Sequence, residues 1–160
     1  DRSEHSVGYS RRQRAGFTAG LEIVDSLNYG LRWANDLWSV GFLSSYQIVE
    51  TRLSLASNYR DWVNQITATR VLSPNLTLTL ATAYTLRYSD TPPAGNLEED
   101  VVTLSSDYDT WASNAGLTYQ LTERLVAYTY VDHTARISDT PEMDFTRDTV
   151  GATLVYRYDF

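Results

Sequence analysis

Residues 150–160 at the end of the chain read VGATLVYRYDF. Every second side chain here is apolar, and this set is Val150, Ala152, Leu154, Tyr156, Tyr158 and Phe160. The side chains between them are smaller or polar and include an arginine and an aspartate. A period of two residues is typical of a β-strand whose two faces meet different surroundings. An apolar face backed by an arginine-bearing face favours a closed sheet with lipid outside and water inside.

The same alternation recurs in residues 76–88, which read LTLTLATAYTLRY. One face of this expected strand carries leucines and tyrosines, and the other carries Thr77, Thr79, Ala81, Ala83, Thr85 and Arg87. The strand follows a tight turn at 72–75, LSPN, and a second such turn is expected at 121–124, LTER. Between these two turns lies a long acidic connection, 89–100. Short turns at one end and long loops at the other are the arrangement of outer-membrane barrels.

Further strands are expected at 108–121 and 124–138, with a loop at 139–145 before the last strand. Upstream, alternation predicts strands at 15–23 and 27–37, separated by a turn at Asp25-Ser26, and a short strand near 6–11. Residues 39–72 allow two interpretations, one long loop with one long strand or three shorter strands. We therefore predict an all-β, antiparallel up-and-down transmembrane β-barrel of about eight strands, with ten as the alternative.

The composition of the 160 residues agrees with one barrel domain spanning 1–160. The hydrophobic fraction is 42% and the mean hydropathy is −0.34, as expected when half of each strand faces a polar interior. Twelve tyrosines and four tryptophans suit aromatic girdles at two membrane interfaces. There is no cysteine, and the net charge of −7 argues against nucleic acid as a partner. A soluble β-barrel or sandwich remains the alternative, because alternation alone does not separate it from a membrane barrel.

The chain resembles bacterial outer-membrane β-barrel proteins, whose last strand commonly ends in Phe after alternating aromatics. The resemblance implies a Gram-negative outer membrane, with membrane lipid and lipopolysaccharide as surroundings. It also implies that barrel-assembly machinery reads Tyr156, Tyr158 and Phe160. Because no signal peptide is visible before Asp1, a mature chain or a fragment is expected.

Within that group the chain is similar to porin-like barrels that accompany exopolysaccharide export. The resemblance lies in 9–12, 72–78 and 143–148. Members are usually longer, so it implies the C-terminal part of a larger barrel or an unusually small relative. The loop at 88–95 also resembles a Pro-Pro-Gly outer loop of salt-induced outer-membrane barrels.

Charged side chains are expected on the inward faces of the strands. By alternation they are Arg12, Arg14, Glu22, Arg32, Asp36, Arg87, Asp132, Arg136, Arg147 and Arg157. Seven of these are the candidates for lining the lumen: Arg32, Asp36, Arg87, Asp132, Arg136, Arg147 and Arg157. In an eight-stranded barrel they would fill the interior as ion pairs. In a wider barrel the same arginines would select anions or acidic polymers.

No catalytic residue, cofactor or metal site is predicted, and the protein is not expected to be an enzyme. His133 follows Asp132 in the chain, but alternation places it on the outward face, away from that carboxylate. Two scattered histidines offer no metal spacing, and the acidic loop is expected to be solvated. The predicted function is a porin-like passive or export pore for small solutes or polysaccharide. The alternative is a non-conducting structural barrel that anchors or forms part of an assembly with other envelope proteins.

Overall fold

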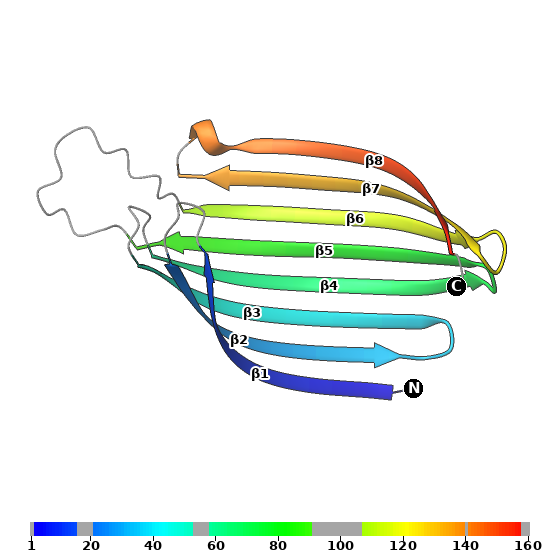
Figure 1. Cartoon of the computed structure of the whole chain (residues 1–160), viewed down its shortest axis with the longest axis horizontal. Coiled ribbons are helices and arrows are strands. Elements are labelled where there is room, and N and C mark those ends of the chain that lie inside the picture. The colour runs from blue at the N-terminus through cyan, green and yellow to red at the C-terminus, as the bar shows by residue number, and fades with distance from the viewer. Residues whose placement is uncertain (1, 16–20, 53–57, 91–106, 140, 158–160) are drawn as a thin grey trace, which may run out of the picture.

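The computed structural model describes residues 2–15, 21–52, 58–90, 107–139 and 141–157. They form one antiparallel sheet of eight strands, each hydrogen-bonded to its neighbours in chain order (Figure 1). The strands are β1 (Arg2–Ala15), β2 (Leu21–Ala34), β3 (Trp38–Arg52), β4 (Tyr59–Ser73), β5 (Leu76–Ser89), β6 (Tyr108–Gln120), β7 (Leu125–Ser138) and β8 (Phe145–Tyr156). A 3-10 helix, η1 (Pro141–Met143), precedes β8. Among the described residues, no helix has the length and apolar composition needed to cross a membrane.

The two ends of the sheet are connected differently, and local hydrogen bonds fix the short connections. Between β2 and β3, the Asn35 side-chain oxygen accepts from the backbone N–H of Leu37 and Trp38, at 3.0 and 2.8 Å. Between β6 and β7, the Thr122 hydroxyl oxygen accepts from the N–H of Leu125 at 3.0 Å. Side-chain oxygens of Asn and Thr commonly close turns in this way. The predicted turns at 72–75 and 121–124 are confirmed, and this end is called the turn end.

The fold class and the count of eight strands are confirmed, but the count was reached through two compensating errors. The segment 15–23 is not one strand, because β1 ends at Ala15 and β2 begins at Leu21. Residues 39–72 hold neither one strand nor three, since β3 and β4 are two long strands. The last strand begins at Phe145, earlier than expected. The acidic loop predicted at 89–100 lies largely outside the described residues.

The turn predicted at Asp25-Ser26 is wrong, because β2 runs through both residues. Asp25 accepts a hydrogen bond from the Tyr9 hydroxyl at 2.6 Å, and Arg11 Nε lies 3.7 Å from the same carboxylate. Ser26 is buried on the opposite face. Asp25 therefore has partners on a neighbouring strand and Ser26 is buried within the sheet, neither of which a turn interpretation considers. Asp and Ser are common in turns, so the Asp25-Ser26 pair within this long strand led to the wrong prediction of a turn.

The sheet is strongly bent, and its two faces differ in chemistry (Figure 1). One face, called the inner face, carries the polar set of each strand, including Ser26, Ser45, Gln65, Asn114 and Asp132. The outer face carries the tryptophans and most of the leucines. Its side chains are widely exposed, with Val7 at 76%, Val150 at 78% and Leu154 at 67%.

Burial identifies which face is concave. Val24, Val49, Glu22, Ser26 and Ser45 are buried and lie on the inner face; Ile23 is the buried exception on the outer face. Side chains on the concave side of a bent sheet crowd together and shield one another, so the polar face is the concave one. This is the distribution of a membrane barrel wall, with apolar side chains outward and polar ones inward.

The described sheet has two free edges. Within the ranges given above, β1 pairs with β2 alone and β8 pairs with β7 alone. The strands have 12 to 15 residues, longer than the roughly 9–11 residues that a tilted strand needs to cross a membrane. The structure is thus a curved wall of strands long enough to cross a membrane.

Candidate functional site on the inner face

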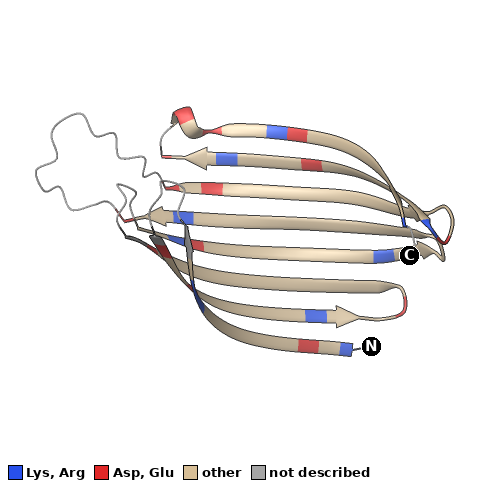
Figure 2. Ribbon diagram, viewed as in Figure 1, with Lys and Arg blue, Asp and Glu red and all other residues tan. Residues whose placement is uncertain are grey.

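Charged residues gather toward the ends of the strands, while the middles of β3 to β6 carry none (Figure 2). On the inner face, the end of β4 to β8 opposite the turn end holds a cluster of arginines and aromatic rings. This end is called the loop end. Strand register brings the cluster together, because Asp61 pairs with Arg87, Arg87 with Tyr108, and Arg136 with Phe145.

Arg87 is fixed from two sides. Its Nε and Nη2 donate to the two carboxylate oxygens of Asp61, at 2.7 and 2.5 Å. Its guanidinium carbon lies 3.8 Å from the ring centre of Tyr59 and 4.9 Å from that of Tyr108. The side chains of Arg87 and Asp61 are 25% and 13% exposed. A bidentate pair with this little exposure neutralises its own charge and holds β4 to β5.

Arg136 has a different environment on β7. Its guanidinium carbon lies 4.1 Å from the ring centre of Tyr108 and 5.0 Å from that of Phe145. Its Nε donates to the Thr110 hydroxyl at 3.4 Å. No carboxylate of the described residues comes within 4.0 Å of it. Its positive charge is therefore positioned without being neutralised.

Toward the middle of β4 to β8, the inner face is hollowed over about 330 Å³. Alanines form much of the lining, and Asn114, Asp132, Thr134, Arg147 and Thr149 supply polar groups. The Asn114 amide donates to the Asp132 carboxylate. Arg147 forms no ion pair with any described acidic residue. The hollow is polar and bears both signs of charge.

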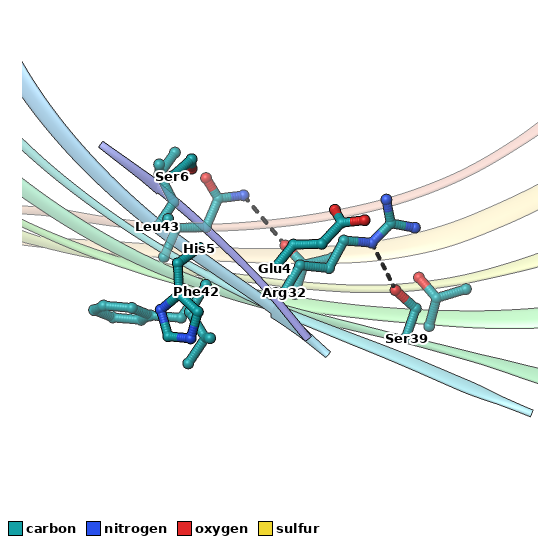
Figure 3. Close-up of a pocket in the computed structure, with 13 residues that line it drawn as sticks. Glu4, His5, Ser6, Arg32, Ser39, Phe42 and Leu43 are labelled. Carbon is teal, nitrogen blue, oxygen red and sulfur yellow. Dashed lines mark hydrogen bonds between the residues drawn. The ribbon is translucent and has the colours of Figure 1, made fainter. Parts of the chain in front are cut away.

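A second hollow of about 550 Å³ lies over β1 to β4 (Figure 3). Arg32 Nε donates to the Ser39 hydroxyl at 3.4 Å, and Glu4 is the register partner of Arg32 on β1. Glycines at 30 and 41 and threonines at 67 and 69 contribute to the lining. Small and hydroxyl-bearing residues leave this part of the inner face open.

Near the turn end, the inner face is packed instead. The rings of Tyr128 and Tyr130 stack with centres 5.4 Å apart. Each ring covers a glycine on a neighbouring strand, Tyr128 over Gly116 and Tyr130 over Gly151. A Cβ at Gly116 would lie 2.8 Å from the Tyr128 ring, so the absence of a side chain makes room for it.

The structure locates the predicted lumen candidates as follows. Arg32, Arg87, Asp132, Arg136 and Arg147 lie on the inner face; their role in a pore stays a prediction. Asp36 is corrected, because it lies in the exposed turn between β2 and β3 and not on a strand. Arg157 is exposed just after β8, and its N–H donates to the Arg124 carbonyl at 2.9 Å. Tyr156 is on the outer face, while Tyr158, Phe160 and the side chain of Arg14 are outside the described residues.

Sequence reasoning missed the aromatic partners of the arginines. Alternation does not reveal the bounds of β4, which carries Tyr59 and the counter-ion Asp61, or the early start of β8, which carries Phe145. Once the strand bounds are known, the alternation of 59, 61 and 63 assigns both to the inner face. The missing information was therefore register rather than residue type.

The outer face carries two rows of aromatic residues with leucine, valine and alanine between them. Tyr46, Trp62, Tyr84 and Trp111 form the row nearer the loop end, and Trp33, Trp38, Tyr119 and Tyr156 form the row nearer the turn end. The indole N–H groups of Trp62 and Trp111 donate to Ser44 and Ser113, at 3.0 and 2.7 Å. His133 lies on this face as predicted, with its Nδ1 2.7 Å from Asp148. Two aromatic rows around an apolar band are what a bilayer requires.

The sequence matches no protein-family model and no curated protein. Two solved structures share its fold. OmpT of Vibrio cholerae, described as expressed in the outer membrane, is 10% identical with a TM-score of 0.63, over 97% of this chain and 51% of that one. A variant of the same outer-membrane protein lacking loop L8 is 11% identical with a TM-score of 0.62, over 97% and 49%. The chain thus has the fold of outer-membrane β-barrel proteins and spans about half the length of those it matches.

Proposed function

We propose that this chain forms part of the wall of a porin-like, water-filled pore in the bacterial outer membrane. The pore passes small polar solutes, and no covalent chemistry is assigned to it. The proposal starts from the fold that the chain shares with outer-membrane barrels. The step from fold to function rests on the hollows and polar side chains of the inner face.

The observation that carries the proposal is the hollowed, polar inner face. Hollows of about 550 and 330 Å³ remain between its side chains. A closed eight-stranded barrel has an interior just wide enough for its side chains to fill. The eight described strands form an open wall with two free edges, so they do not close into such a barrel by themselves. A wider barrel, whose interior holds water, accounts for these hollows.

The outer face supports the location in the membrane. The band between the aromatic rows presents large exposed apolar side chains, including Leu80, Leu117 and Val131 at 42%, 41% and 51%. Such a continuous apolar surface is unfavourable in water, whereas it is stabilised by acyl chains. Lipid and lipopolysaccharide are therefore the proposed surroundings.

A non-conducting structural barrel is the second candidate. The packed turn end of the inner face favours it, because Tyr128 and Tyr130 occupy space there. The Asp61–Arg87 pair also links β4 to β5. Export of polysaccharide, as opposed to passage of small solutes, is a variant of the first candidate.

Conductance in planar bilayers tests the proposal. The protein, purified from outer membranes in detergent, is expected to insert in discrete steps of constant conductance in KCl. The control variant is Arg70→Gln, which removes a charge from the outer face, where Arg70 lies over Trp38. Its conductance should equal that of the unaltered protein. Bilayers that stay silent, although the protein migrates faster on gels before boiling than after, would favour the structural barrel.

A further inference from the structure

We infer that Arg136 and Arg147 form a binding step for small dicarboxylates on the inner face of β7 and β8. The inference deepens the proposed pore function and rests on it. It names a solute class and distinguishes two arginines that act on solutes from one, Arg87, that serves structure. The distinction follows from what each guanidinium contacts.

Arg136 is a preorganised cation. The rings of Tyr108 and Phe145 lie close to its guanidinium, and its Nε donates to Thr110. Aromatic rings attract a cation without removing its charge. The Nη groups, which form the fork that matches a carboxylate, have no acidic partner among the described residues. Its orientation is therefore set before a solute arrives.

In the same cluster, the guanidinium of Arg87 already has an acidic partner. Both oxygens of Asp61 accept from its guanidinium, so the fork is already occupied. An anion would have to displace a bidentate carboxylate to bind there. The cluster thus offers Arg136, and not Arg87, to solutes.

Arg147 supplies the second positive charge. It is the register partner of Thr134 on β7, while Arg136 is the partner of Phe145 on β8. The two arginines are diagonal neighbours on adjacent strands, a placement with Cβ atoms roughly 7 Å apart. Side chains on neighbouring positions of one face can reach the same solute, so two guanidinium groups, each binding one carboxylate, suit the two ends of a four-carbon dicarboxylate.

The hollow beside Arg147 provides space and limits affinity. Ala81, Ala83 and Ala112 keep it open, and the hydroxyls of Thr134 and Thr149 line it. Asp132 also lines it, with Asn114 donating to its carboxylate. This negative charge opposes an anion and keeps binding weak. Conduction needs a site that is favourable enough to enter and weak enough to leave.

Succinate is the probe for two measurements on the detergent-purified protein. In titration calorimetry, Arg136→Gln/Arg147→Gln should weaken succinate binding by about tenfold or more, because charge-assisted hydrogen bonds are lost. Asp132→Asn should strengthen it, and Arg70→Gln on the outer face should leave it unchanged. Acetate should bind more weakly than succinate, since it meets one guanidinium.

In a bilayer with a salt gradient, the double variant should conduct but shift its reversal potential toward cation selectivity. Equal succinate binding by the double variant and the unaltered protein overturns the inference, as does an equal loss with Arg70→Gln. Silent bilayers would contradict the proposed pore alone, because the calorimetry still tests the site. Faster migration before boiling confirms that each variant is folded.

Discussion

At the residue scale, the inner face shows how identical side chains take different roles. Arg87 on β5, Arg136 on β7 and Arg147 on β8 all lie on the inner face. One is neutralised by Asp61, one is held by rings and a hydroxyl, and one borders a hollow. The contacts of each arginine, rather than its position in the alternation, decide whether its charge is available.

Removing Asp61 tests the structural role of its pair. Asp61→Ala leaves the partly buried Arg87 without its counter-charge, and we expect a loss of about 3 kcal/mol in the free energy of unfolding. Asp61→Ala/Arg87→Ala should be less destabilised than Asp61→Ala, because no unpaired charge remains. Guanidinium unfolding in lipid vesicles, followed by tryptophan fluorescence, measures both. Equal stability of Asp61→Ala and the unaltered protein would contradict this role.

The glycines under the tyrosine pair give a second prediction. Gly151→Ala places a methyl group against the Tyr130 ring, and we expect a cost of about 1–3 kcal/mol from overpacking. Gly41→Ala is the matched control, since a Cβ there meets nothing within 4 Å. The same unfolding experiment compares them. Combining Gly151→Ala with Tyr130→Ala should remove the clash, so further loss beyond that of Tyr130→Ala would count against the explanation.

At the element scale, each strand separates two environments by alternation alone. On β7, Val131 faces outward and is 51% exposed, whereas Thr134 faces the hollow on the inner side. The same strand thus has an apolar face and a polar face, so a substitution is expected to have opposite consequences on the two faces. The face on which a side chain lies, set by its odd or even position along the strand, therefore decides its role in a membrane.

Arginine scanning of β7 tests this assignment. Val131→Arg should lower the free energy of unfolding in vesicles by about 2–4 kcal/mol, because it places a charge on the lipid side. Thr134→Arg, on the inner face, should cost far less and add positive charge beside Arg147. Similar costs for both variants would mean that the two faces do not meet different solvents.

Sequence alone predicted β5, β6 and β7 closely, placed the start of β8 too late, and did not predict the bounds of β1 to β4. In β5 to β7, apolar and polar residues alternate regularly, and tight turns at Pro74-Asn75 and at Thr122 mark where strands end. The sequence therefore predicts both the bounds of these strands and the face on which each side chain lies. In β2 to β4, polar residues such as Asp25 and Asn64 stand on the outer face and interrupt the pattern. Their partners, Tyr9 and Ser44, lie on other strands. Hydrogen bonds across the strands satisfy these polar side chains, and the pattern of residues along a single strand does not reveal which strands pair.

At the scale of the whole molecule, the structure is a bent wall with an apolar band outside and a charged, hollowed surface inside. The candidate site was predicted in part: the arginines follow from alternation, whereas their aromatic partners required the register of β4 and β8. The two hollows follow from small residues that converge from several strands. A single strand does not reveal such a space.

The absence of cysteine allows the whole wall to be mapped by thiol labelling. With single cysteines introduced along β5, Ala81→Cys and Ala83→Cys should react with a water-soluble, membrane-impermeant maleimide. Leu78→Cys and Leu80→Cys should react instead with a lipid-soluble reagent, since they lie on the outer face. Labelling of protein in vesicles, read by mass shift, checks the alternation. Equal labelling of both sets by the water-soluble reagent would contradict a membrane-spanning wall.

The strict neighbour-to-neighbour order of the strands has a kinetic consequence. Every pairing of the described sheet joins strands adjacent in the chain, so it can zip together hairpin by hairpin without long-range searches. The hairpins closed at Asn35, Asn75 and Thr122 have short connections and form quickly, whereas β5 and β6 must first close the span between Ser89 and Tyr108. The joining of β6 to β5 is therefore expected to be the slow event that unites two preformed halves of the wall.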